Sequence, residues 1–84
     1  PTYKLSSSKM DKNSNLKIYL MNELFGTSFS VQVQGDGQLV QADPMFNTFN
    51  EATIEIQPKA PFTSTVTVTV TSEDFRPLTI EIPY

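Results

Sequence analysis

The stretch T-S-T-V-T-V-T-V-T, residues 63–71, decides the fold class, because valine and threonine alternate along it with a period of two. Successive side chains of a β-strand point to opposite faces of a sheet, so the valines would face a core and the threonines the other side. Both residue types are β-branched, and a helix would restrict their side chains. We therefore predict a strand here. Because the stretch has no charge and no proline to protect an edge, we expect it inside a sheet, paired on both sides.

Alternation continues on both sides of this stretch. Residues 78–82 alternate after a turn-rich connection, which predicts a hairpin with the 63–71 strand. Residues 52–57 and 29–34 also alternate, and Gly35-Asp36-Gly37 follows the latter and leads into residues 38–41. Glycine and aspartate adopt positive φ at low cost, so we interpret this stretch as a second hairpin.

The N-terminal part of the chain leaves an alternative open. Residues 16–20 alternate like a strand, whereas Leu16, Leu20 and Leu24 are also spaced as on a helix that Gly26 would end. We favour the strand because every neighbouring element is predicted to be β. Tyr3-Lys4-Leu5 is expected to form a short first strand. Asp43-Pro44-Met45-Phe46 has the cap and proline of one helical turn.

Short strands with turn signals between them predict an all-β, antiparallel, immunoglobulin-like β-sandwich of about seven strands. We expect one domain over residues 1–84, as a module of a longer chain. The expected core consists of Phe29, Val31, Val33, Ile54, Ile56, Val66, Val68, Val70, Leu78, Ile80 and Ile82.

The pattern of residues 29–34, 52–57, 66–71 and 78–82 resembles the immunoglobulin-like modules of bacterial and phage surface proteins. The chain lacks the paired cysteines and core tryptophan of antibody domains, so immunoglobulin and fibronectin type III strand orders both stay open. The resemblance implies a non-catalytic structural, spacer or accessory module on an extracellular, cell or virion surface. An independent protein-binding unit is the alternative, and a carbohydrate-binding module is a third hypothesis.

Composition argues against several other functions. The chain has no cysteine and no histidine, which excludes disulfides, thiolate metal sites and histidine-based triads. Its net charge of −3 argues against nucleic-acid binding, and no apolar run approaches the roughly 20 residues of a membrane span. We expect no enzyme activity, no cofactor and no metal. Glu73-Asp74 is interpreted as a solvated turn.

Asp36, between two glycines, has surroundings that suggest a cation site. Together with Asp43 and main-chain carbonyls it could contribute oxygen ligands. We favour instead a turn in which the Asp36 side chain bonds its own backbone.

Charge is uneven along the chain. Residues 1–20 hold four lysines and one aspartate, a net +3, whereas residues 21–84 have a net −6. Such a distribution is typical of an ordinary solvated surface. The alternative is a basic leading edge that docks on an acidic neighbour, head to tail in an array.

Met45, Phe46 and Phe49 lie within residues 43–50, a segment expected to be a connection, and we favour a loop that folds its phenylalanine side chains over the open end of the sandwich. The alternative is a protein-contact patch formed by these residues. Phe25 would join the patch if the loops share an end. The expected partner is another protein or a neighbouring domain of the same chain, and the isolated domain is expected to be a monomer.

Overall fold

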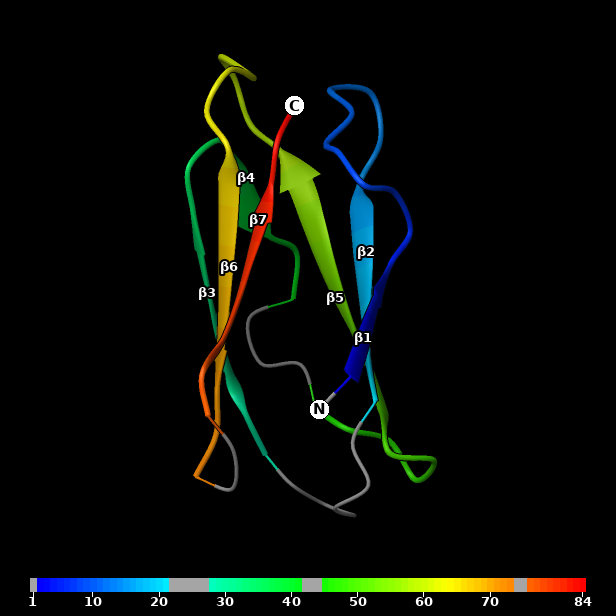
Figure 1. The fold of residues 1–84 in the computed structure, drawn as a ribbon. Helices are drawn as coiled ribbons and strands as arrows, with labels where there is room; N and C mark the ends of the chain where they lie inside the picture. The colour runs from blue at the N-terminus through cyan, green and yellow to red at the C-terminus, as the bar shows by residue number, and fades with distance from the viewer. Residues whose placement is uncertain (1, 22–27, 42–44, 74–75) are drawn as a thin grey trace.

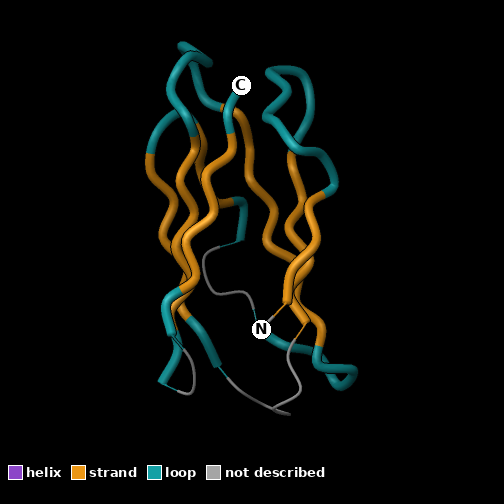
Figure 2. Tube along the Cα trace, viewed as in Figure 1, coloured by secondary structure: helices purple, strands orange, loops and turns teal. Residues whose placement is uncertain are grey.

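The computed structural model describes residues 2–21, 28–41, 45–73 and 76–84, which form seven strands and no helix (Figures 1 and 2). The strands are β1 (Thr2–Leu5), β2 (Leu16–Met21), β3 (Ser30–Gln34), β4 (Gly37–Leu39), β5 (Glu51–Pro58), β6 (Val66–Thr71) and β7 (Leu78–Ile82). In the part of the chain thus described, no helix is long and apolar enough to cross a membrane.

The strands form two antiparallel sheets that face each other. One sheet has the order β1-β2-β5-β4 and the other the order β3-β6-β7. If β1 to β7 are lettered A to G, the two sheets have the orders ABED and CFG, which is the strand arrangement of a seven-stranded, constant-type immunoglobulin domain. The predicted all-β sandwich is confirmed, and β4 pairs with β5 in the first sheet.

The threonine–valine strand is central, as predicted. β6 lies between β3 and β7, and Val68 stands opposite Val33 on one side and Ile80 on the other. The three valines of β6 are fully buried, while its threonines face outward. The predicted start at residue 63 is wrong: β6 begins at Val66. The backbone N–H groups of Thr63 and Ser64 instead donate to the Asp36 carboxylate, so this segment turns away before the sheet begins.

The predicted hairpin around Gly35-Asp36-Gly37 is also wrong. β3 and β4 belong to different sheets, so these residues carry the chain across the sandwich. Gly37 lies where the two sheets approach, since a Cβ there would stand 3.0 Å from side-chain carbons of both Ile56 and Val66. The local turn chemistry of glycine and aspartate was recognised correctly. What the turn joins is decided by the packing of the two sheets.

The core differs from the prediction mainly in the N-terminal half. Residues 16–21 form a strand, which settles the strand-or-helix alternative for that part of 16–25; residues 22–25 lie outside the described residues. Four residues expected in the core, Phe29, Val31, Val33 and Leu78, are only partly buried and pack against it. The buried apolar residues are Met10, Leu16, Ile18, Leu20, Ala52, Ile54, Ile56, Val66, Val68, Val70, Ile80 and Ile82.

The sandwich is elongated, with extents of 38 × 20 × 20 Å, and its two ends carry different connections. We call one the Tyr84 end; it holds residues 6–15, 35–36, 59–65 and 83–84 (Figure 1). We call the other the Phe49 end; it holds residues 45–50 and the described residues 72–73 and 76–77 between β6 and β7. Of the predicted helical turn, Asp43 and Pro44 lie outside the described residues, and Met45 and Phe46 have no regular structure.

Candidate functional site

A tight turn at the Phe49 end is closed by one asparagine. The Asn47 side-chain Oδ1 accepts hydrogen bonds from the N–H of Phe49, at 2.8 Å, and of Glu51, at 3.1 Å. The Asn47 backbone N–H donates to the Glu51 carbonyl at 2.8 Å. Asparagine side chains commonly stabilise turns in this way by bonding the backbone two residues on. Phe49 therefore stands at the tip of a turn that is tied at its base.

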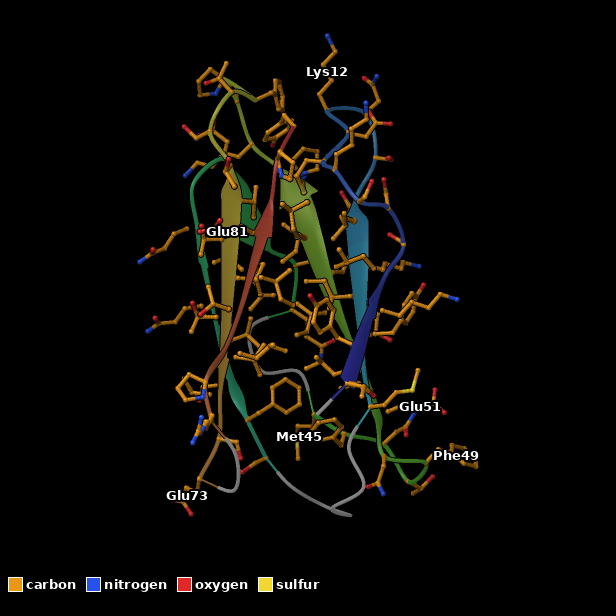
Figure 3. All side chains as sticks on the ribbon, in the orientation of Figure 1. Lys12, Met45, Phe49, Glu51, Glu73 and Glu81 are labelled. Atoms are coloured by element: carbon orange, nitrogen blue, oxygen red, sulfur yellow. The ribbon has the colours of Figure 1, made fainter. Side chains whose placement is uncertain are left out.

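Asn50 also fixes the backbone conformation of this turn. Its φ of 60° lies in the left-handed region, which asparagine tolerates better than most residues. Its N–H donates to the Asn47 carbonyl at 3.0 Å. The side chain of Phe49 is 78% exposed, the highest value among the large hydrophobic residues that the structure describes. The turn thus presents an aromatic side chain to solvent on a defined backbone (Figure 3).

The predicted contact patch is divided by the structure. Phe46 is half-buried and packs on Phe29, with ring centroids 4.7 Å apart, as expected for a residue that covers the open end of the sandwich. Met45 is 69% exposed and lies at the same end as Phe49 (Figure 3). Phe25 lies outside the described residues. Of the four residues predicted for the patch, Met45 and Phe49 are therefore presented to solvent.

Asp36 organises the opposite, Tyr84 end. Its carboxylate Oδ2 accepts hydrogen bonds from the N–H groups of Thr63 and Ser64, both at 2.9 Å. Its backbone carbonyl accepts one from the N–H of Lys59, at 3.1 Å, and another from the Tyr84 hydroxyl. The expectation that Asp36 bonds its own backbone is wrong: the N–H donors to its carboxylate are Thr63 and Ser64, on a loop distant in sequence. Asp36 joins the β3–β4 crossover, the β5–β6 loop and the C-terminal residue.

These contacts lower the pKa of the Asp36 carboxyl. The hydrogen bonds from Ser64 and then Thr63 favour the ionised form, and the positive charge of Lys59 adds a smaller effect. Because the pKa is lower in the folded than in the unfolded chain, ionised Asp36 stabilises the fold at neutral pH. That contribution is lost as the pH falls from about 4 through the folded pKa.

We therefore expect Asp36→Asn to be less stable than the wild type at pH 7, and the difference to shrink as the pH falls toward 2. Asparagine keeps an oxygen acceptor but loses the charge that strengthens both bonds. Urea unfolding of both proteins between pH 7 and pH 2 measures this. A difference that stays constant over that range would show that the Asp36 charge is not involved.

A hollow of about 470 Å³ opens beside this network. It is lined by Ser7, Lys9, Met10, Asp11, Lys12, Phe62 and Tyr84. Phe62 and Tyr84 meet edge to face, with ring centroids 6.0 Å apart, and the Met10 N–H donates to the Pro83 carbonyl at 2.7 Å. Sequence reasoning missed this hollow because its walls come from three segments far apart in the chain. The lysines of the basic N-terminal region were the only available signal.

The carboxylates do not gather into a site among the described residues. No group of three or more acidic, histidine or cysteine side chains there could hold a metal ion. Of the cation site weighed for Asp36 and Asp43, Asp36 has its carboxylate committed to the 63–64 backbone, and Asp43 lies outside the described residues. Glu73 is exposed, and its neighbour Asp74 also lies outside them.

No protein-family model matches the chain, and the comparisons with curated proteins and with solved structures find no significant match. The class of this protein is therefore defined by its fold, a seven-stranded sandwich with the immunoglobulin constant-type strand order. Its candidate functional features are the exposed Phe49 turn at one end and the aromatic, lysine-lined hollow at the other.

Proposed function

We propose that this chain is a non-catalytic, immunoglobulin-like module that acts by protein contact, made through its Phe49 end. The observation that carries the proposal is the 78% exposed Phe49 side chain on a turn tied by Asn47. Met45, 69% exposed at the same end, enlarges the apolar surface. A role as a passive spacer would not require a large aromatic side chain held out in solvent.

Physical chemistry favours protein as the partner. Aromatic residues and methionine are enriched at protein interfaces, where phenylalanine supplies large apolar area and methionine adapts to irregular surfaces. A fixed turn also reduces the entropy lost on binding, because the backbone is already in one conformation. Carbohydrate binding, the other candidate ligand class, has less support, since the outer face of the β3-β6-β7 sheet presents glutamine, serine, threonine and glutamate side chains without an aromatic stacking surface.

Loss of partner binding in Phe49→Ala is the expected result. We expect the affinity for the partner to fall by about ten- to a hundredfold, the range of an aromatic residue at the centre of an interface. The partner would be captured from the source cells with the wild-type chain, identified, purified and then titrated against both proteins by calorimetry. Because Phe49 is exposed, the thermal unfolding midpoint should change little.

A matched control is Val40→Ala, which truncates an apolar side chain that is 52% exposed and whose N–H donates to the Glu55 carbonyl, four residues along β5 from Glu51. This variant should bind the partner as the wild type does. Equal binding by Phe49→Ala and the wild type would refute the proposed contact.

A further inference from the structure

We propose that the Phe49 end of one copy docks on the hollow at the Tyr84 end of a second copy, so that the copies associate head to tail. This inference rests on the proposed function, because it names the surface that the Phe49 turn contacts. Three observations carry it: the apolar complementarity of the two ends, their opposite charges and their positions on the long axis of the sandwich.

The apolar surfaces of the two ends match in kind. Phe49 projects from its turn, whereas the hollow has Phe62, Tyr84 and Met10 in its wall. A volume of about 470 Å³ lies within the range of ligand-binding sites and accommodates one aromatic side chain. Aromatic rings favour edge-to-face or offset contacts, and Phe62 and Tyr84 already meet in this way. A third ring can add to this cluster.

The charges around the two surfaces are opposite. Lys9 and Lys12 line the hollow together with Asp11, so the charged side chains of its lining carry a net +1, and all three are exposed. At the Phe49 end the exposed acidic residues Glu51 and Glu73 (Figure 3) outnumber the exposed Arg76, a net −1 among these described side chains. Complementary charges at the rim of an interface steer association and fix its orientation.

The positions of the ends allow the contact to repeat. The two surfaces lie at opposite ends of the 38 Å axis, so that a copy engaged through its Phe49 end keeps its hollow free for another (Figure 1). Such a heterologous contact does not close into a symmetric dimer and produces a row of copies. The expected product is an elongated assembly.

The size of the contact predicts a weak interaction. Extents of 20 × 20 Å limit each end to about 400 Å², well below the roughly 800 Å² per partner of a stable interface. We expect a dissociation constant on the order of 1 mM. The isolated chain is then a monomer at micromolar concentration, and the contact becomes strong only where copies are held close together.

Charge-reversal variants test the contact by complementation. Lys9→Glu with Lys12→Glu makes the hollow acidic, and Glu51→Lys with Glu73→Lys makes the Phe49 end basic. Each double variant alone has ends that repel, whereas the mixture offers two complementary pairs. The native pair joins the Phe49 end of the first variant to the hollow of the second, and the charge-swapped pair joins the Phe49 end of the second variant to the hollow of the first. Neither variant alone should show concentration-dependent amide shifts at about 1 mM in nuclear magnetic resonance spectra. The mixture should show them at residues 45–51 and around the hollow, in both variants.

The matched control adds Phe49→Ala to both double variants. This leaves the net charges of the mixture unchanged, so any attraction of overall charge persists. We expect at least tenfold weaker association if Phe49 enters the hollow. Equal association with and without Phe49 would overturn the inference, as would a mixture without shifts.

Failure of the head-to-tail contact can be distinguished from failure of the proposed function. If the mixture shows no shifts while Phe49→Ala still loses a purified protein partner, the head-to-tail contact is wrong and the proposed function stands. A titration of the wild type with benzoate, a small aromatic carboxylate, tests the hollow alone. Saturable shifts of the hollow with benzoate, together with a mixture that does not associate, would assign the hollow to small ligands and overturn the inference.

Discussion

Gly35→Ala is expected to lower the free energy of unfolding by about 3 kcal/mol or more, because two costs combine at this position. Gly35 has φ +89°, a conformation that residues with a side chain rarely adopt. An added Cβ would also overlap the backbone carbonyl of Thr65, which cannot rotate away as a side chain can. Stability in proteins of 84 residues is roughly 4–13 kcal/mol, so this one methyl group would remove a large part of it.

Urea unfolding followed by circular dichroism measures the Gly35 effect. The matched control is Gln34→Ala, the preceding residue, whose side chain is exposed on β3; its effect should stay within about 0.5 kcal/mol. A Gly35→Ala protein as stable as this control would contradict the close approach of the β3–β4 crossover to Thr65.

Ile56→Ala is the second change with a large expected effect, a loss of about 2–5 kcal/mol. Ile56 is fully buried in β5 and stands opposite Leu16 of β2 and Leu39 of β4. Gly37 packs closely against Ile56: a Cβ added to Gly37 would lie only 3.0 Å from the Ile56 Cγ2. Truncation would leave a cavity between the sheets, and the close packing on both sides limits how far neighbouring residues can collapse into it.

The same unfolding experiment distinguishes burial from local strand propensity. Thr53→Ala changes a β-branched residue of the same strand whose side chain is exposed on the outer face. We expect this control to cost less than about 1 kcal/mol, the full span of β-propensity. Similar losses for both variants would mean that Ile56 does not contribute through the core.

The Phe49 end could be predicted from the sequence in part, whereas the hollow at the Tyr84 end could not. Met45, Phe46 and Phe49 were selected from the sequence as large apolar residues in a connection, and Met45 and Phe49 are exposed there. That Phe46 instead packs on Phe29 depends on which loops share an end. The hollow at the Tyr84 end could not be predicted, because residues 7–12, Phe62 and Tyr84 are brought together only by the strand order.

The sequence by itself determined the class of structure. Alternation of apolar and polar residues over residues 66–71, 78–82 and 52–57 specifies strands with one buried face, because the side-chain period of a strand is two. The same local chemistry placed the β6–β7 hairpin and the central position of β6. The strands and the hairpin depend on residues that are near in sequence. The central position of β6 follows because this strand lacks the charges and prolines that protect an edge strand.

Tertiary structure alone decided how the turns are used. Gly35-Asp36-Gly37 carries the signal of a hairpin, yet it joins the two sheets, because β3 pairs with β6 and β4 with β5. Asp36 then bonds Thr63 and Ser64, donors that are 27 and 28 residues away and adjacent only in the folded chain. Turn residues specify a local backbone conformation, whereas strand pairing follows from the burial of whole faces, and the burial of faces is a property of the complete sandwich.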